Sequence, residues 1–577
     1  MQSSAAFYPF AMHRLLRTLI AAAVAVLAFP LSAAAAPTST PPGRLDDAVV
    51  RQLQLTPESQ TIPVIVEGAL DSSDNDGGER RARRAEDKVR GNGGNVSGSS
   101  ALLGATVAQL TPSQIRDLST DGSIGRIIFD APVHATAINA NEVAQPTTPI
   151  TFPETIGAPE AWNQGKTGKG VTVAVLDTGI NNDPAFGARV KARVDLIDPA
   201  HPAQGDPAGH GTHVAGIIGA SHSSPVPGLA PDANLVSIRV LDEQGQSRLS
   251  TVIHGLEWIV SHRKSMHIDV AVMALGAPAQ GSYRDDPLAA AVELAWRSGV
   301  VVVTAAGNDG PATGTVQTPG YDPLVLTVGA LDENGTTTLA DNSIPDWSSR
   351  GPTSDRIAKP DVVAPGRRIV SLRVPGGTIE QQSPDHIEGP RTFRLSGSSQ
   401  ATAVTAGAVA LLLDQRPGLD PDEVKALLVN SARELPRVDA TAQGAGSLNV
   451  ARAFSTRTPR DVRQHAMPAA GVLRALLPQI RDLLKQDGEV WDKVLWDKVL
   501  WDKVLWDKVL WDKVLWDKVL WDKVLWDKVL WDRVLWDKVL WDKVLWDKVL
   551  WDKVLWDKVL WDKVLWDKVL WDAHLYD

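Results

Sequence analysis

The 577-residue chain contains no cysteine, which excludes disulfide bridges and thiolate metal sites. It also lacks a long block of basic residues, and its formal net charge is −10, so its composition does not predict nucleic-acid binding. Beyond the first 36 residues, no apolar run is long enough to span a bilayer. Tryptophan, in contrast, is abundant: seventeen of the 21 tryptophans stand at or after Trp491, in a C-terminal tail of unusual composition. The length predicts more than one folding unit.

Residues 1–36 have the organisation of a secretory signal peptide. A basic stretch, His13–Arg17, precedes an apolar stretch at 19–29, and small residues at 32–36 supply a cleavage site. The apolar stretch is short for a membrane span, although a retained N-terminal anchor is the alternative. Translation from Met12 would give a more ordinary signal peptide than translation from the first residue. The sequence therefore predicts a secreted protein.

Residues 37–60 are rich in proline and threonine and are expected to form a linker. Residues 61–135 show the pattern of a small mixed domain. Its expected elements are a strand at 61–67, a charged helix at 79–90, a strand pair at 101–110 with a turn at Gly104, a helix opened by a capping box of Thr111 and Gln114, and a final strand at 124–133. The order β-α-β-β-α-β predicts a ferredoxin-like α+β fold.

After a second linker at 136–150, residues 151–455 alternate short apolar runs with helical stretches. This alternation indicates an α/β fold, with a parallel sheet flanked by helices. Strands are predicted at 171–176, 234–240, 268–275, 300–305 and 324–328, and helices at 251–261, 287–297, 402–413 and 421–431. The helix at 402–413 is apolar on all sides, so it should be buried.

Two short motifs in this region place an acid and a base at the expected ends of elements. The run VAVLDTG at 173–179 is a strand that ends in Asp177, and the carboxyl ends of parallel strands face the ligand crevice. The run GHGTHVAG at 209–216 places His210 at a helix start between two glycines. A histidine can take the proton of a serine hydroxyl, and a carboxylate can hold that histidine in the correct tautomer.

A serine for such a pair is expected in LSGSSQAT, residues 395–402, which stands directly before the buried helix. A serine cluster before a helix is also typical of a loop with an N-cap, so the residues alone leave the choice among its three serines open. The buried strand at 300–305 leads to Asn308, whose amide can donate a hydrogen bond to a developing oxyanion. Together these motifs predict nucleophilic catalysis by a serine.

In this order, the motifs VAVLDTGI, GHGTHVAGI, VVTAAGND and GSSQATAVTAG resemble those of the subtilase family of serine proteases. The resemblance covers roughly residues 150–455. Residues 61–135 resemble, less closely, the family's N-terminal propeptide, which acts as a chaperone and a tethered inhibitor. The resemblance implies a subtilisin-like fold, activity on proteins or peptides, and a zymogen that is cut between about Ala137 and Thr151.

The resemblance also assigns roles to residues. The family pattern Gly-Thr-Ser-Met-Ala, matched through Gly397, Ala401 and Gly407, makes Ser399 the nucleophile. Asp177 then orients the base His210, and the oxyanion hole consists of Asn308 and the backbone N–H of Ser399. A peptide substrate is expected to pair as a strand with two segments of the cleft, which contain Leu275 and Gly276 on one side and Gly245, Gln246 and Ser247 on the other.

Three features depart from the family's pattern. Gln400 replaces the methionine beside the nucleophile, which removes an oxidisable thioether. Ala185 takes the place of a common calcium ligand, and the loop 221–227 has neither Asn nor carboxylate, so the usual calcium site is expected to be lost. No metal or other cofactor is therefore predicted, although calcium at another site stays open. Residues 373–393 contain an insertion that either lines the cleft or forms a surface loop.

After a connector at 456–487, residues 488–577 form a pentad-repeat tail. Sixteen consecutive WDKVL pentads begin at Trp491, one of them with Arg533 in place of lysine. A period of five spreads the apolar residues over every face of a helix or a flat strand. Short strands with Asp-Lys corners would instead form a β-solenoid. The tail is either an expanded spacer or a binding surface for polysaccharide, a membrane interface or another tail.

The sequence thus predicts a secreted serine endopeptidase that is made as a self-processing zymogen. Its expected partners are protein or peptide substrates and its own propeptide as inhibitor, and contact of the tail with a cell wall or membrane surface would add a cell-surface location. The alternative is a surface adhesion protein in which the Trp-rich tail is the functional part.

Overall fold

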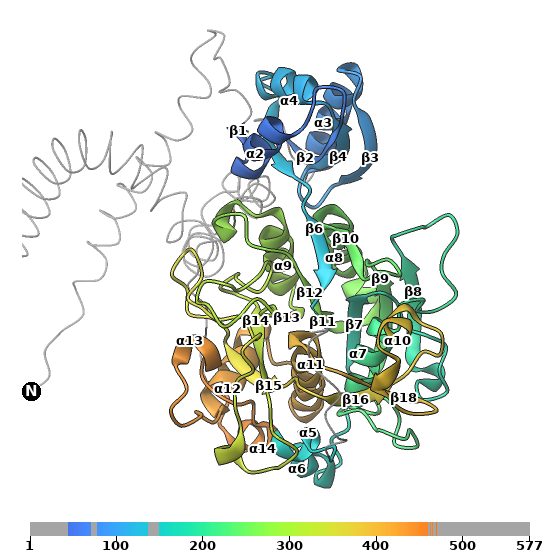
Figure 1. Cartoon of the computed structure of the whole chain (residues 1–577), viewed down its shortest axis with the longest axis vertical. Helices are drawn as coiled ribbons and strands as arrows, with labels where there is room; N and C mark the ends of the chain where they lie inside the picture. Colours follow the sequence, from blue (N-terminus) through green and yellow to red (C-terminus); the bar gives the residue numbers. More distant parts are fainter. Residues whose placement is uncertain are drawn as a thin grey trace, which may run out of the picture.

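The computed structural model describes residues 44–70, 78–136 and 149–459, together with residues 462, 464 and 469, and shows two packed domains (Figure 1). The predicted signal peptide, most of the linker at 136–150, nearly all of the connector and the whole pentad tail lie outside the described residues. Among the helices in the described ranges, none combines the length and the apolar character that crossing a membrane requires.

The N-terminal domain, residues 44–131 with the gap at 71–77, contains a five-stranded sheet with strand order β1-β5-β2-β4-β3. Its elements are β1 (Arg44–Leu45), α2 (Asp47–Leu55), β2 (Ile62–Gly68), α3 (Glu79–Gly91), β3 (Asn95–Ser100), β4 (Ala105–Leu110), α4 (Pro112–Ser119) and β5 (Ile124–Phe129). From β2 to β5 the order is β-α-β-β-α-β, as predicted. The capping box of Thr111 and Gln114 is present at the start of α4. The domain has a core of its own that includes Val64, Val89 and Ile115.

The prediction of a linker at 37–60 is wrong for its second half. Strand β1 pairs in parallel with β5, and α2 buries Ala48 and Val49 against the domain. The helix is capped by Asp46, whose side chain accepts a hydrogen bond of 3.0 Å from the Ala48 N–H. Because the proline and threonine residues are concentrated at 37–42, composition averaged over the whole segment hid a short capped helix.

Two predicted strand boundaries in this domain are also wrong. The strand pair at 101–110 begins earlier, with β3, and residues 101–104 form the turn, in which Gly104 has a φ of +67°. The small polar residues of β3, NVSGSS, carry little strand signal. The strand predicted at 124–133 is two strands, because β6 (Pro132–Ala135) leaves the domain and pairs within the second one.

The main domain, residues 149–459, is built on a seven-stranded parallel sheet with strand order β15-β14-β13-β11-β7-β9-β8. The strands are β7 (Thr172–Asp177), β8 (Val190–Asp195), β9 (Asn234–Arg239), β11 (Ile268–Met273), β13 (Val301–Ala305), β14 (Leu326–Leu331) and β15 (Val362–Pro365). The central strands are buried and mostly apolar because helices cover both faces of the sheet. This confirms the predicted α/β architecture.

Helices α7 (His210–Gly219) and α11 (Ser398–Gln415) pack against each other, and so do α8 (Leu249–Met266) and α9 (Pro287–Arg297). The predicted helix at 402–413 is buried along its whole length within α11. Further helices are α5 (Phe152–Thr155), α6 (Ala158–Asn163), α12 (Pro421–Ser431), α13 (Ala440–Gln443) and α14 (Val450–Ser455). Helix α11 contacts five strands of the sheet, β7, β11, β13, β14 and β15, which holds its first turn at the strands' carboxyl ends.

Two small antiparallel sheets lie beside the main one. The first has the order β10-β6-β12, so that β6 lies between β10 (Gln246–Arg248) and β12 (Leu275–Gly276) of the main domain. The second belongs to the insertion and its flanks and contains β16 (Ile369–Leu372), β18 (Thr392–Leu395) and β17 (Ile387–Gly389), with α10 (Thr378–Gln382) in the connection. Figure 1 shows β6 entering the main domain from above and α10 beside α7.

Candidate active site

The predicted acid, base, serine and amide come together at the carboxyl ends of the parallel strands. Asp177 is the last residue of β7, and Asn308 follows β13. His210 is the first residue of α7, and Ser399 is the second residue of α11. Strand ends and helix starts meet at this edge of an α/β sheet, which is where such sheets bind ligands.

Glycine at the second position of α7 lets this helix approach β7. A Cβ at Gly211 would lie 2.2 Å from the carbonyl oxygen of Gly179 and 3.1 Å from Cβ of Asp177. Gly209, the N-cap residue, has a φ of +95°, a conformation that side chains rarely adopt. The two glycines around His210 are therefore what brings its ring to the end of β7.

His210 and Asp177 form a buried pair. His210 Nδ1 lies 2.7 Å from Asp177 Oδ1, and the two side chains are 2% and 0% exposed. Burial opposes a positive charge on the ring, but the charge and hydrogen bond of Asp177, together with the charge of Asp206, outweigh it, so the pKa of His210 is raised above its ordinary value. His210 Nε2 has no hydrogen bond to any residue that the structure describes. The ring is thus oriented through Nδ1 and can accept a proton at Nε2.

A second buried carboxylate, Asp206, was missed by the sequence reasoning. Its oxygens accept hydrogen bonds from Thr178 Oγ1 (2.7 Å), the Gly209 N–H (2.8 Å) and both the N–H and the hydroxyl of Thr212 (2.7 Å each). It thereby joins the residue after Asp177 to the first turn of α7 and positions His210. An aspartate shortly before a helix start is a recognisable capping signal, and it could have singled out Asp206.

Ser399 has its hydroxyl turned towards the end of β6. Its Oγ donates a hydrogen bond of 2.9 Å to the Ala274 carbonyl and lies 2.9 Å from Thr136 Oγ1. Among the described residues, Ser399 therefore has no hydrogen bond to His210, although the predicted chemistry needs one. The neighbouring Ser398 has a different environment, because its N–H and its Oγ both lie 2.9 Å from Asn308 Oδ1.

Asn308 is held so that its amide nitrogen faces the end of β6. Because Asn308 Oδ1 accepts both hydrogen bonds of Ser398, the NH₂ group points away, and Nδ2 donates to the carbonyl oxygen of Thr136 at 2.6 Å. The backbone N–H of Ser399 lies 3.3 Å from the same oxygen. Two donors thus converge on one carbonyl oxygen, as in an oxyanion hole.

The five residues predicted to bind substrate all flank β6. In the antiparallel register, Gln246 stands opposite His134 and Ser247 opposite Val133 on one side, and Leu275 opposite Ala135 and Gly276 opposite His134 on the other. The Ala135 N–H also donates to the Gly245 carbonyl at 2.9 Å, and the Thr136 N–H to the Ala274 carbonyl at 3.1 Å. The chain's own strand therefore fills the place that the prediction assigned to a peptide substrate.

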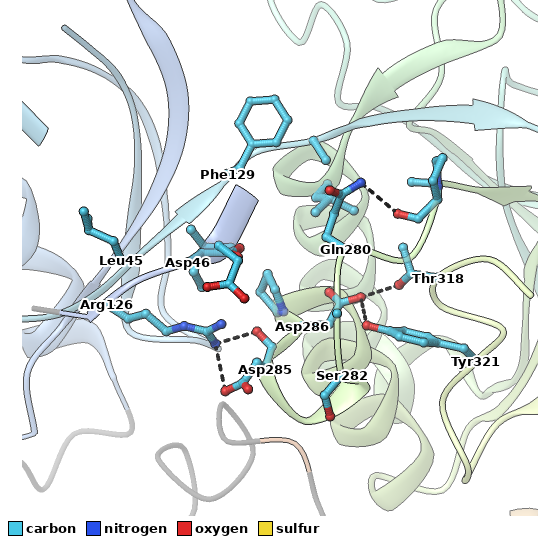
Figure 2. A pocket seen from close by; sticks show the side chains of 18 residues that line it. Leu45, Asp46, Arg126, Phe129, Gln280, Ser282, Asp285, Asp286, Thr318 and Tyr321 are labelled. Carbon is cyan, nitrogen blue, oxygen red and sulfur yellow. Dashed lines mark hydrogen bonds and ion pairs between the residues drawn. The ribbon is translucent and has the colours of Figure 1, made fainter. Parts of the chain in front are cut away.

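Polar contacts beside this strand fix the N-terminal domain on the main domain. In the pocket of Figure 2, the Arg126 side chain, which is 7% exposed, reaches from β5 to the carbonyl and the carboxylate of Asp285. Asp286 accepts hydrogen bonds from Thr318 and Tyr321 behind it.

Asp130 makes a further contact between the domains. Its carboxylate accepts hydrogen bonds from the N–H and the hydroxyl of Ser250, at 2.9 and 2.7 Å, in the first turn of α8. The N-terminal domain thus satisfies a helix start of the main domain.

The structure describes Ala185, which is buried, and the loop 221–227. Across the described ranges, no group of three or more acidic or histidine side chains is arranged to hold a metal ion. The absence of a metal cofactor stays a prediction.

Comparison with known proteins extends these observations. The sequence model of the Subtilase family matches residues 168–454 of the chain. Serine protease AprX of Bacillus subtilis (strain 168) is 39% identical over 351 residues, which are 59% of this chain and 77% of that protein. Subtilisin E of the same organism is 33% identical over 371 residues, 64% of this chain and 85% of that protein.

Among solved structures, that of fervidolysin from Fervidobacterium pennivorans is similar, with a TM-score of 0.55 and 21% identity over 74% of this chain and 64% of that chain. At this identity, the likeness concerns the subtilisin-like α/β fold alone.

The fold and the relatives define a serine protease, a hydrolase that acts on protein or peptide substrates. The chain belongs to the subtilase family.

Proposed function

We propose that the chain is a secreted serine endopeptidase, made as a zymogen whose N-terminal domain blocks its own active site. The observation that carries the proposal is the position of Thr136, whose carbonyl oxygen accepts hydrogen bonds from Asn308 Nδ2 and the Ser399 N–H. This carbonyl has the surroundings that a substrate's attacked carbonyl requires. Strand β6 therefore stands in for the part of a substrate that precedes the cleaved bond.

In the proposed mechanism, Ser399 Oγ leaves its hydrogen bond to Ala274 and attacks the substrate's carbonyl carbon, while His210 Nε2 takes the hydroxyl proton. The new C–O bond turns the carbonyl oxygen into an oxyanion, which Asn308 Nδ2 and the Ser399 N–H stabilise. His210 gives the proton to the leaving amine as the C–N bond breaks. A water molecule then repeats the sequence on the acyl group and releases the acid, while Asp177 keeps the imidazole oriented throughout.

The same contacts support the bond between Thr136 and Ala137 as the one that is cut during maturation. This bond lies at the start of the range 137–151 that the sequence predicts. Because β6 makes backbone hydrogen bonds on both sides, the strand is held before the cut as a substrate would be and keeps its contacts directly after the cut. The released N-terminal domain is accordingly proposed to act as an inhibitor.

The test compares the full-length zymogen with its Ser399→Ala variant. The wild-type chain should yield a large fragment whose N-terminal sequence begins at Ala137, and this fragment should hydrolyse casein. The variant should stay uncut and inactive. Cleavage of the purified variant at the same bond and at the wild-type rate would contradict the proposal.

Secretion is supported by the composition of residues 1–36, which lie outside the described residues. The alternative of a surface adhesion protein is not favoured, because the relatives are proteases over the matched length. Contact of the tail with a cell wall or membrane surface stays a prediction, and deletion of residues 488–577 tests it. Loss of cell association with protease activity intact would support such contact, and unchanged association would oppose it.

The second donor of the proposed oxyanion hole provides a further prediction. Asn308→Ala should lower kcat by about 10²–10³-fold with little change in KM, because the amide is expected to bind the transition-state oxyanion more strongly than the ground-state carbonyl. Steady-state kinetics on a short peptide substrate measure both parameters. Asn163→Ala, a substitution at the exposed last residue of α6, serves as the control. A loss below threefold in Asn308→Ala would contradict the assigned role.

Gln400 supplies a prediction about oxidation. The side chain is buried, and neither amide atom has a hydrogen bond to a residue that the structure describes. Because an amide has no thioether to oxidise, the protease should retain its activity in dilute hydrogen peroxide, whereas Gln400→Met should lose activity with time. Residual casein hydrolysis after timed exposure measures the difference. Equal rates of inactivation in the two proteins would contradict the prediction.

A further inference from the structure

The insertion at 373–393 lies against the loop that leads to His210. The N–H groups of Thr378 and Ile379 donate to the main-chain carbonyls at positions 207 and 208, at 3.2 and 3.1 Å. If Gly209 carried a Cβ, it would lie 3.2 Å from Ile379 Cγ1. Of the two alternatives that the sequence leaves open, the structure thus shows the first, because residues of α10 line the cleft beside the proposed base.

The insertion is held in this place by its own contacts. Arg373 and Glu380 form an ion pair across the start of the insertion, and the N–H of Gly376 donates to Glu380 Oε1 at 3.2 Å. Gln381 Nε2 closes the same turn with a hydrogen bond of 2.7 Å to the Gly376 carbonyl. These contacts make α10 a fixed wall of the cleft.

A cavity of about 140 Å³ separates α10 from the segment 243–246, with His210 in its wall. Ala135, the residue before Thr136, also borders this cavity. Since β6 stands in for a substrate, Ala135 occupies the P2 position, one residue before the one whose carbonyl is attacked. An alanine side chain leaves the cavity empty, so a longer P2 side chain can extend into it.

The chemistry of the cavity wall favours one kind of side chain. Ile379 and Ala208 offer an apolar surface in the wall of the cavity, whereas Thr378 and Gln382 are polar. Among the described residues around the cavity, Glu243 carries the only permanent charge, and its side chain is about half exposed. A side chain with an apolar stem and a cationic tip matches an apolar wall that has one exposed carboxylate beside it.

We propose that this cavity is a specificity pocket for a long basic side chain, arginine or lysine, at the P2 position of the substrate. The stem would pack on Ile379, and the cationic tip would lie near Glu243. The inference rests on the proposed endopeptidase function, since it places a substrate along β6. Burial of the stem should favour arginine over alanine about tenfold, and the charge should add about two- to fivefold, because the carboxylate is exposed and already near Arg239.

The test uses the processed enzyme and peptides with Val at P4 and Thr at P1 that differ only at P2, which is alanine, arginine or citrulline. Citrulline has the length of arginine without its charge. We expect kcat/KM to rise from alanine to citrulline to arginine. Glu243→Gln should abolish the preference for arginine over citrulline. Ile379→Trp, which fills the cavity, should lower kcat/KM for the arginine and the citrulline peptides relative to the alanine peptide. Glu160→Gln, on the surface of α6, is the matched control and should leave all ratios unchanged.

Separate outcomes identify which claim fails. Equal or better cleavage of the alanine peptide by the wild-type enzyme would overturn the pocket. Equal cleavage of the citrulline and arginine peptides, or an arginine preference that survives Glu243→Gln, would overturn the role of charge. If no peptide is cleaved at all, the proposed function itself fails.

Discussion

Replacing Ser399 by alanine should lower kcat for casein and peptides by about 10⁶-fold and leave the bond after Thr136 uncut. The expected loss is this large because the hydroxyl is the atom that forms the covalent bond, and the magnitude is the one known for the nucleophile of a subtilisin. The residual rate would come from binding and from the donors around the carbonyl oxygen, which are not changed. Mass spectrometry of the zymogen and a casein assay measure the two losses separately.

Ser398→Ala is the matched control variant, because it removes the neighbouring hydroxyl and keeps Ser399. Ser398 supports the Asn308 amide through its Oγ and its N–H, and only the first of these bonds is lost. The variant should therefore process itself and keep most of its activity. If Ser399→Ala still cuts itself and Ser398→Ala does not, Ser398 would be the nucleophile instead.

Replacing Asp177 by asparagine should lower kcat by about 10⁴-fold. The amide is nearly the same size, but it no longer holds the Nδ1 proton of His210 and no longer stabilises the imidazolium that forms when the ring takes the serine proton. The pair is fully buried, so water does not replace the lost carboxylate. Stopped-time assays with the processed enzyme, obtained by adding wild-type enzyme in trans, measure the loss.

The pH profile of this variant separates a catalytic role from a merely structural one. Asp177 raises the pKa of His210 in the native chain, and the base works only when it is neutral, so activity falls as the pH drops through that raised pKa. Without the carboxylate the pKa is lower, and the acid limb of kcat/KM should move to lower pH. An unchanged acid limb would mean that His210 is not the base whose titration limits the rate.

The parallel sheet was predictable because its central strands are buried on both faces. Runs such as Val301–Ala305 are buried and almost entirely apolar, and the structure places this strand within one residue of the predicted bounds, 300–305. Strand β8 was not predicted, because it lies at the edge of the sheet and its sequence, VKARVD, alternates with charged residues. The other edge strand, β15, was also not predicted; it is buried throughout, but its sequence VVAP is only four residues long and ends in proline.

The site was predictable to a similar degree. Motifs around Asp177, His210 and Asn308 place each residue at the end of an element, and topology then brings those ends together. The direction of the Ser399 hydroxyl was not predictable, since it depends on the carbonyl of Ala274 and on Thr136, which lies 263 residues away. Neither was the break between β5 and β6, because the contacts of Asp130 that fix it are made with Ser250 in the other domain.

Strand β6 also has a consequence for the solubility of the processed protein. Strand β6 lies in the middle of the sheet β10-β6-β12, so its removal leaves two facing edges with unpaired backbone groups. Long open edges of this kind promote association between molecules. Here the edges are three and two residues long, and they belong to different segments of the chain. A cleft between such short strands accepts a single extended chain, but its edges are too short for another sheet to pair with them. The processed enzyme can therefore keep an open cleft without aggregating through it.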